Sequence, residues 1–128
     1  MVNGGHQTQA SRQTEPAHYR LDVWKQSMKL VKVVYQLTAE FPAEEKFGLT
    51  AQMRRSAISV PSNIAEGAAR GSRGDFVRFL QIARASLMEL DTQLWLARDL
   101  GFIENARETR QQLISILKLL NGLMQSRG

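Results

Sequence analysis

The 128-residue sequence contains no cysteine, which excludes disulfide bridges and thiolate metal sites. Its two histidines, His6 and His18, both precede the first predicted helix, so no predicted helix carries an imidazole. No apolar stretch approaches the length of a membrane span, and the N-terminus lacks the apolar core of a signal peptide. We therefore expect a cytoplasmic protein with no membrane association.

The missing cysteines and histidines also argue against enzymatic sites. Carboxylate-bridged di-iron bundles need Glu-x-x-His pairs, and bundle-type ribonucleases of the HEPN class use an Arg and His pair. Ser59, Ser62 and Ser86 have no histidine base to activate them. Glu89 and Asp91 are two residues apart, so on a helix their carboxylates point to different faces. We expect no enzyme activity, no cofactor and no metal site.

Positive charge is in excess. The chain has 17 lysines and arginines against 12 acidic residues, which gives a formal charge of +5. The excess lies mainly after residue 50 and is carried mostly by arginine. This distribution favours an anionic partner such as nucleic acid.

Apolar residues recur at helical spacing in four segments, and neither strand-like alternation nor an internal repeat is present. Short loops join the segments, which is typical of an all-α, antiparallel up-down four-helix bundle. Residues 1–18 are polar and aperiodic, so we expect a disordered N-terminal tail followed by the bundle over residues 19–128. The helices are expected over residues 22–39, 50–71 and 72–99, and from residue 105 to near the C-terminus.

Polar residues are placed where they would cap these helices. Asp22 and Thr50 are the candidate N-caps of the first and second helices. Ser72 and Asn105 are each followed three residues later by an acidic residue, a variant of the capping box. Gly101 follows the third helix, where a left-handed cap is common.

The second predicted helix has a clear apolar stripe that is interrupted by a proline. Its apolar stripe is predicted to face the core and consists of Met53, Ala57, Val60, Ile64 and Ala68. Pro61 lies in the middle of this stripe and removes one helical hydrogen bond. Because the stripe keeps its phase across the proline, we expect the helix to continue through Pro61 with a kink.

A second line on the same helix is polar and is joined by one residue of the third helix. This predicted polar seam consists of Gln52, Arg55, Ser59, Asn63, Glu66 and Glu89. In a hairpin that turns near Gly71, facing positions have numbers that add to roughly 142, so Glu89 is the natural partner of Arg55. We expect Arg55, Ser59, Asn63 and Glu66 to be shielded at the bundle seam or at a subunit boundary. The alternative is that Arg55 points outward and binds phosphate.

Three basic groups are candidates for contact with nucleic acid. Four arginines surround the turn between the second and third helices, namely Arg70, Arg73, Arg78 and Arg84. Arg54 is predicted on the outer side of the second helix, and the first helix carries a lysine ridge formed by Lys25, Lys29 and Lys32. Guanidinium groups bind phosphate oxygens in a bidentate manner. The alternative is a solvated surface with local ion pairs, because basic clusters are common and interleaved aromatic residues are lacking at the arginine turn.

The third helix carries more apolar residues than one core-facing stripe can bury. Met88, Trp95 and Leu96 are the candidates for a surface that contacts another subunit or a partner protein.

The chain closely resembles the four-helix-bundle family of bacterial 23S ribosomal RNA intervening-sequence proteins. The similarity lies in GLTAQMRRSAISVPSNIAEGAARGS and in the following DFVRFLQIARASLMELDTQLWLARDLGFI. It extends from about Tyr19 to the end of the fourth helix, and its most specific part runs from Arg54 to Gly67. Ser56 and Ala85 depart from it, because the family usually has alanine and glycine there. Close relatives in the family are the accessory variability proteins of diversity-generating retroelements.

The resemblance implies a bundle that assembles into a ring-like homopentamer and has no enzymatic activity. For the retroelement members it implies a basic surface that binds RNA or DNA and contacts a reverse transcriptase. Two functions therefore compete. The first is a nucleic-acid-binding accessory factor that acts through a basic outer surface, and the alternative is a protein-interaction scaffold with no nucleic-acid role.

Overall fold

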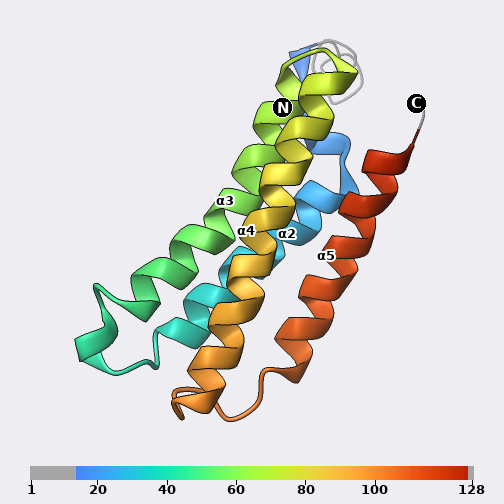
Figure 1. Ribbon diagram of the computed structural model, residues 1–128. Helices are drawn as coiled ribbons and strands as arrows, with labels where there is room; N and C mark the ends of the chain where they lie inside the picture. The colour runs from blue at the N-terminus through green and yellow to red at the C-terminus, as the bar shows by residue number, and fades with distance from the viewer. Residues whose placement is uncertain (1–13, 127–128) are drawn as a thin grey trace, which may run out of the picture.

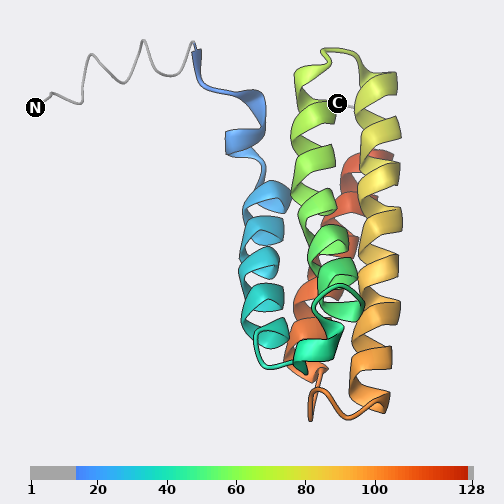
Figure 2. The same ribbon diagram turned by 90° about the vertical axis from the view of Figure 1, so that its left-hand side faces the viewer.

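The computed structural model describes residues 14–126 and consists of helices joined by short connections. The four long helices are α2 (Asp22–Thr38), α3 (Leu49–Ala69), α4 (Arg73–Asp99) and α5 (Arg107–Gln125), with short 3-10 turns η1 (Ala17–Arg20) and η2 (Ala43–Glu45). No strand occurs within this range, so the predicted all-α, four-helix fold is confirmed. The α3–α4 connection lies at one end of the molecule, and the α2–α3 and α4–α5 connections lie at the other (Figures 1 and 2).

Each long helix contributes one apolar stripe to a single core. The largest fully buried side chains are mostly leucines, isoleucines and valines from all four helices, together with Met53. From the predicted stripe of α3, four residues are buried, and Ala68 at its end is half-buried. The helical spacing therefore identified the core-facing side of this helix correctly.

Helix α3 runs without interruption through Pro61, which is itself buried. This continuity agrees with the unbroken phase of the apolar stripe. The ring removes an N–H donor at this position, but the rest of the helix remains held by its own hydrogen bonds and by burial of its apolar face. The kink at Pro61 stays a prediction.

Helices α3 and α4 approach each other very closely near their shared connection. A Cβ atom built on Gly67 would lie 2.7 Å from the Cβ of Phe79 and 3.3 Å from the carbonyl oxygen of Phe76. Further along the pair, the hydroxyl oxygens of Ser59 and Ser86 are 2.7 Å apart. Small side chains at these positions allow the two backbones to come together.

The free amides at the starts of the helices are bonded by other groups than most of the predicted caps. Ser72 caps α4 as predicted, because its Oγ accepts a hydrogen bond from the amide of Asp75 at 3.2 Å. The predicted cap at Thr50 is wrong, because this residue lies inside α3. The amide of Leu49 instead donates to a carboxylate oxygen of Glu45 in the preceding turn. Asp22 is the first residue of α2 and makes no side-chain cap there.

At α5 the predicted cap is displaced by one residue. Asn105 lies one residue before the N-cap position, and its side-chain oxygen accepts from the amide of Arg107 at 2.8 Å. The left-handed residue predicted after the third helix is present, because Gly101 has a φ value of 82°. Gly71, in the predicted turn between α3 and α4, has a φ value of 84°, a conformation that favours glycine. Short-range side chains can thus serve a helix end from outside the cap position.

Helix α5 is tied to α4 by three arginine contacts along its length. Nη2 of Arg73 lies 2.7 Å from the carbonyl oxygen of Leu123 and 2.6 Å from that of Ser126, so it serves the free carbonyls at the end of α5. Arg84 donates to the side-chain oxygen of Asn121 at 2.8 Å. Near the start of α5, a further arginine, Arg110, donates to Asp91.

The chain before α2 packs on it through aromatic rings. His18 in η1 makes edge contacts with the rings of Tyr19 and Trp24, and Tyr19 stacks on Trp24 with ring centroids 5.5 Å apart. The predicted tail over residues 1–18 therefore includes the first part of η1. Residues 1–13 lie outside the described range.

The close α3–α4 approach predicts a large cost for a single added methyl group. We expect Gly67→Ala to lower the free energy of unfolding by about 1–3 kcal/mol, because the new Cβ would overlap the fixed Cβ of Phe79. Gly122→Ala is the matched control, since a Cβ there meets nothing within 4 Å. This control should stabilise the protein by roughly 0.5–1 kcal/mol through its helix propensity. Urea unfolding of both variants measures the difference, and equal effects would contradict the proposed packing constraint.

The arginine contacts with α5 predict unequal stability effects. Arg73→Gln should lower the free energy of unfolding by about 1 kcal/mol, because a charge-assisted contact with the end of α5 is lost. Arg78→Gln is the control, since no hydrogen bond joins Arg78 to α5 within the described residues. It has an exposed ion pair with Asp75 at 3.5 Å and a contact with the ring of Phe79, and losing both should cost about 0.5 kcal/mol. Thermal unfolding monitored by circular dichroism tests this order, and a larger loss for the control would refute it.

Candidate nucleic-acid interface

Two arginines of the predicted basic turn stack on one aromatic ring. The guanidinium carbons of Arg70 and Arg78 lie 4.8 Å and 4.6 Å from the ring centroid of Phe79. Each also forms an exposed ion pair, Arg70 with Glu66 at 2.9 Å and Arg78 with Asp75 at 3.5 Å. The turn therefore does contain an aromatic residue between its arginines, contrary to the expectation from sequence. The local carboxylates offset much of the positive charge.

The other three predicted arginines make contacts that hold helices together. Arg73 and Arg84 bond to α5 through the carbonyl and amide oxygens at its C-terminal end. Arg54 is half-buried against α2 rather than outward-facing: its Nε donates to the hydroxyl of Thr38 at 2.8 Å, and its guanidinium lies 4.4 Å from the ring centroid of Tyr35. These guanidiniums thus have a structural role that sequence reasoning did not identify.

The lysine ridge of α2 is the predicted basic group with the least compensation. Lys25, Lys29 and Lys32 are all exposed, on the side of the helix opposite its buried residues. No ion pair involves them within residues 14–126. Their ammonium groups remain available to an external anion.

Four members of the predicted polar seam line one groove between α3 and α4. The hollow has a volume of about 350 Å³. Its lining residues are Gln52, Arg55, Ser56, Ser59, Ser86, Glu89 and Gln93. The side-chain amide of Asn63 donates to the hydroxyl of Ser59 at 2.9 Å and extends this polar network along α3. The side-chain oxygen of Gln93 is buried and has no hydrogen-bond partner within the described chain.

The expected shielding of the polar seam is only partly present within one chain. Ser59 and Asn63 are half-buried, but Arg55, Glu66 and Gln52 are exposed. Arg55 and Glu89 share the groove without forming an ion pair in the described residues, so the predicted intrachain pair is corrected. Both residues are exposed, so water competes for their charges and burial does not hold them against each other. Shielding at a subunit boundary stays a prediction.

The most shielded ion pair instead joins α4 to α5. Nε of Arg110 lies 2.8 Å from a carboxylate oxygen of Asp91, and both side chains are less than one-third exposed. Glu89 faces α3 while Asp91 faces α5, which agrees with the expectation that the two carboxylates point to different faces.

Helix α4 carries several exposed apolar residues. The three predicted interface residues Met88, Trp95 and Leu96 are 38%, 38% and 48% exposed. Ile82 and Leu100 on the same helix are exposed as well. These residues supply apolar surface that the bundle core does not cover.

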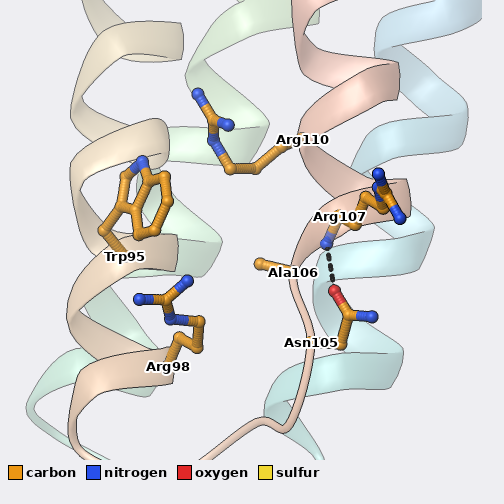
Figure 3. Close-up of a pocket in the computed structure, with 6 residues that line it drawn as sticks. All are labelled: Trp95, Arg98, Asn105, Ala106, Arg107 and Arg110. Carbon is orange, nitrogen blue, oxygen red and sulfur yellow. Dashed lines mark hydrogen bonds between the residues drawn. The ribbon is translucent and has the colours of Figure 1, made fainter.

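Trp95 belongs to a second hollow, which lies between α4 and the start of α5 and has a volume of about 310 Å³. Figure 3 shows Trp95 and Arg98 on α4 facing Arg110 and Ala106 across the hollow, with Asn105 and Arg107 on its far side. The guanidinium carbons of Arg98 and Arg110 lie 4.5 Å and 4.9 Å from the indole centroid. All three charged residues that line this Trp95 pocket are arginines.

Sequence reasoning missed this pocket because its residues come from α4, from α5 and from the connection between the two helices. The available signal was a pair of spacings, Trp95 to Arg98 and Arg107 to Arg110, each three residues apart on one helix. The two pairs meet only if α4 and α5 are aligned in one particular register. Neither spacing specifies that register.

Neither a membrane-spanning helix nor a metal-binding cluster is found in residues 14–126. No helix there combines the length and the apolar content that a bilayer crossing requires. No group of three or more histidine, cysteine, aspartate or glutamate residues converges to hold an ion there.

The comparisons with known proteins point to one family. The family model described as 23S rRNA-intervening sequence protein matches residues 19–122. No curated protein matches the chain. Among solved structures, the chain is similar to a protein of unknown function from the S23 ribosomal protein family of Bacteroides thetaiotaomicron VPI-5482. That structure is 25% identical, with a TM-score of 0.72, and the match covers 81% of this chain and 99% of the other.

The predicted resemblance is therefore confirmed at the level of the family, from motifs in α3 and α4 to the arrangement of the helices. Because the family model spans most of the bundle, the chain belongs to the family of 23S rRNA-intervening sequence proteins.

Proposed function

We propose that this protein is a non-enzymatic, cytoplasmic accessory factor that assembles with copies of itself and binds RNA or DNA through its basic outer surface. The single observation that carries the proposal is the uncompensated lysine ridge of α2. On ordinary solvated helices, lysines alternate with acidic residues at i,i+4 spacing and form local pairs. Lys25, Lys29 and Lys32 have no such pairs within the described residues.

The spacing of the ridge suits a phosphate backbone. Its first and last lysines, Lys25 and Lys32, are seven residues apart on one helix, which corresponds to about 10 Å along the axis. Lysine binds phosphate as a point charge with three donors, so it needs no fixed fork geometry. The net charge of +5 acts in the same direction by attracting a polyanion at long range.

Self-association is supported by the composition of the α3–α4 surface. The chain has no lysine between residues 47 and 117, a depletion that is typical of protein interfaces. The same surface carries exposed Leu96, which is seven residues after Glu89 and so lies on the same face of α4. The groove beside it holds Arg55 and Glu89, neither of which has an ion pair within residues 14–126. A second copy would cover this apolar area and supply partners for both charges. The family resemblance sets the expected assembly as a homopentamer.

A protein-interaction scaffold without a nucleic-acid role is the second candidate, and the exposed apolar residues of α4 favour it. The resemblance to retroelement proteins adds a reverse transcriptase as a candidate partner. Salt separates the two functions, because nucleic-acid binding through several phosphates weakens steeply with added salt. Binding through an apolar surface does not.

The lysine ridge yields a quantitative prediction. The triple variant Lys25→Gln/Lys29→Gln/Lys32→Gln should bind a fluorescein-labelled RNA hairpin at least tenfold more weakly. The slope of log affinity against log salt should fall by about 2–3, because up to three phosphate contacts are lost. Fluorescence anisotropy across a salt series measures both quantities.

Lys46→Gln is the matched single-residue control for Lys29→Gln. Both lysines are exposed and both changes remove one charge, but Lys46 lies beside η2 and away from the ridge. Equal losses for the two single variants would mean that net charge alone drives binding and would contradict a ridge site. A wild-type protein that binds no RNA or DNA at low salt would sink the nucleic-acid proposal itself.

The assembly yields a second prediction. Light scattering should give wild type a mass about five times the 14.4 kDa of one chain. Leu96→Lys should dissociate it, because a charge would enter the apolar contact. Phe47→Lys is the control, since Phe47 is 88% exposed, lies in the α2–α3 connection and should leave the mass unchanged. A monomeric wild type at micromolar concentration would refute the assembly, and an unchanged mass for Leu96→Lys would refute this surface.

A further inference from the structure

We infer that the Trp95 pocket is a binding site for single-stranded nucleic acid, with a base against the indole and phosphates along the flanking arginines. The inference rests on the proposed nucleic-acid function and assigns it a second site, separate from the lysine ridge of α2. The two sites would contact different features of the ligand, since the ridge offers only charge and the pocket offers charge beside an aromatic surface.

The arginines of the pocket differ in how many of their nitrogen atoms already contact a carboxylate. Arg110 uses its Nε to bond Asp91 at 2.8 Å, which fixes the side chain. Its terminal nitrogens have no hydrogen-bond partner among the described residues. Arg98 has only a 3.5 Å contact with its neighbour Asp99. Both guanidiniums are therefore held next to the indole while they keep donors for a phosphate.

Trp95 supplies the surface for a base. It is 38% exposed although two guanidiniums lie against its ring, so part of the indole still faces solvent in the hollow. Stacking of a base on an exposed aromatic ring tolerates any sequence, because every base has a π-face. A stacked base would cover this exposed part of the ring.

The basic surface continues from the pocket along α5. Arg107 and Arg110 also line an adjoining hollow of about 430 Å³ that reaches Ile114 and Lys118. From Arg107 to Lys118 the helix rises about 16 Å, enough for more than one phosphate. A strand can thus follow α5 and place one base at Trp95. In a duplex the bases are paired and stacked inside, so the indole could not reach one.

The test uses the full-length protein with a short fluorescein-labelled oligouridylate, a labelled oligothymidylate and the matching duplex. Both single strands should bind more tightly than the duplex, and they should quench tryptophan fluorescence in the Trp24→Phe background, where Trp95 is the only tryptophan. Inorganic phosphate at matched ionic strength should leave the fluorescence unchanged. Quenching by phosphate equal to that by the strands would reduce the pocket to an anion site and overturn the inference.

Variants in the otherwise native chain separate stacking from charge. Trp95→Leu should weaken single-strand binding about tenfold, whereas Trp95→Phe keeps an aromatic face and should retain most of the affinity. Arg98→Gln should weaken binding more than Arg20→Gln, its control in η1 at the opposite end of the bundle (Figure 2). Thermal unfolding of each variant establishes that it is folded.

The outcomes distinguish this site from the general function. If wild type binds the strands but neither Trp95→Leu nor Arg98→Gln changes the affinity, the pocket is not the site and the lysine ridge still stands. If Trp95→Phe loses as much affinity as Trp95→Leu, stacking is refuted. If wild type binds none of the probes at low salt, both the proposed function and this inference fail.

Discussion

The close contact between α3 and α4 is the constraint on which the rest of this structure depends. Gly67 lies so near Phe79 that no larger residue fits without a shift of backbone or ring. Ser59 and Ser86 meet further along the same pair. Because these small side chains let the two helices pack tightly on one side, the leucines of α4 can reach the core that α2 and α5 share. Close packing of α3 and α4 thus explains why these three positions hold a glycine and two serines.

The arginines of this chain divide into those that build the bundle and those that face outward. Arg54 holds α3 to α2, while Arg73, Arg84 and Arg110 hold α5 to α4. A guanidinium can do this because it presents several donors in a planar group and stays partly hydrated at the surface. Much of the apparent arginine surplus is therefore engaged in interhelical contacts, and the positive charge that remains free is concentrated on α2 and at the α4–α5 end.

This division places three different surfaces on one small bundle. The lysine ridge of α2 is purely cationic, the α3–α4 surface is poor in lysine and carries exposed apolar residues, and the Trp95 pocket combines guanidiniums with an indole. A self-associating protein that also contacts a polyanion needs such a separation, because a lysine-rich surface would repel its copy and an apolar surface gives phosphate no donor. The exposed carboxylates beside Arg70 and Arg78 make the α3–α4 turn the least suitable of the basic regions.

The sequence by itself determined the all-α class, the four helices, their core-facing stripes, the cap at Ser72 and the family. These follow from periodicity and from short-range motifs, which depend only on neighbours along the chain. The sequence also predicted that Gln52, Arg55, Ser59 and Glu89 lie together, because the turn near Gly71 sets an approximate register between α3 and α4.

The tertiary structure alone decided which charged side chains are engaged in contacts between helices. These contacts all join different helices: the ion pair of Arg110 with Asp91, the hydrogen bonds of Arg73 and Arg54, and the stacking of Arg110 on Trp95. Their geometry depends on the rotation and offset of each helix against the next, and no local pattern encodes those quantities.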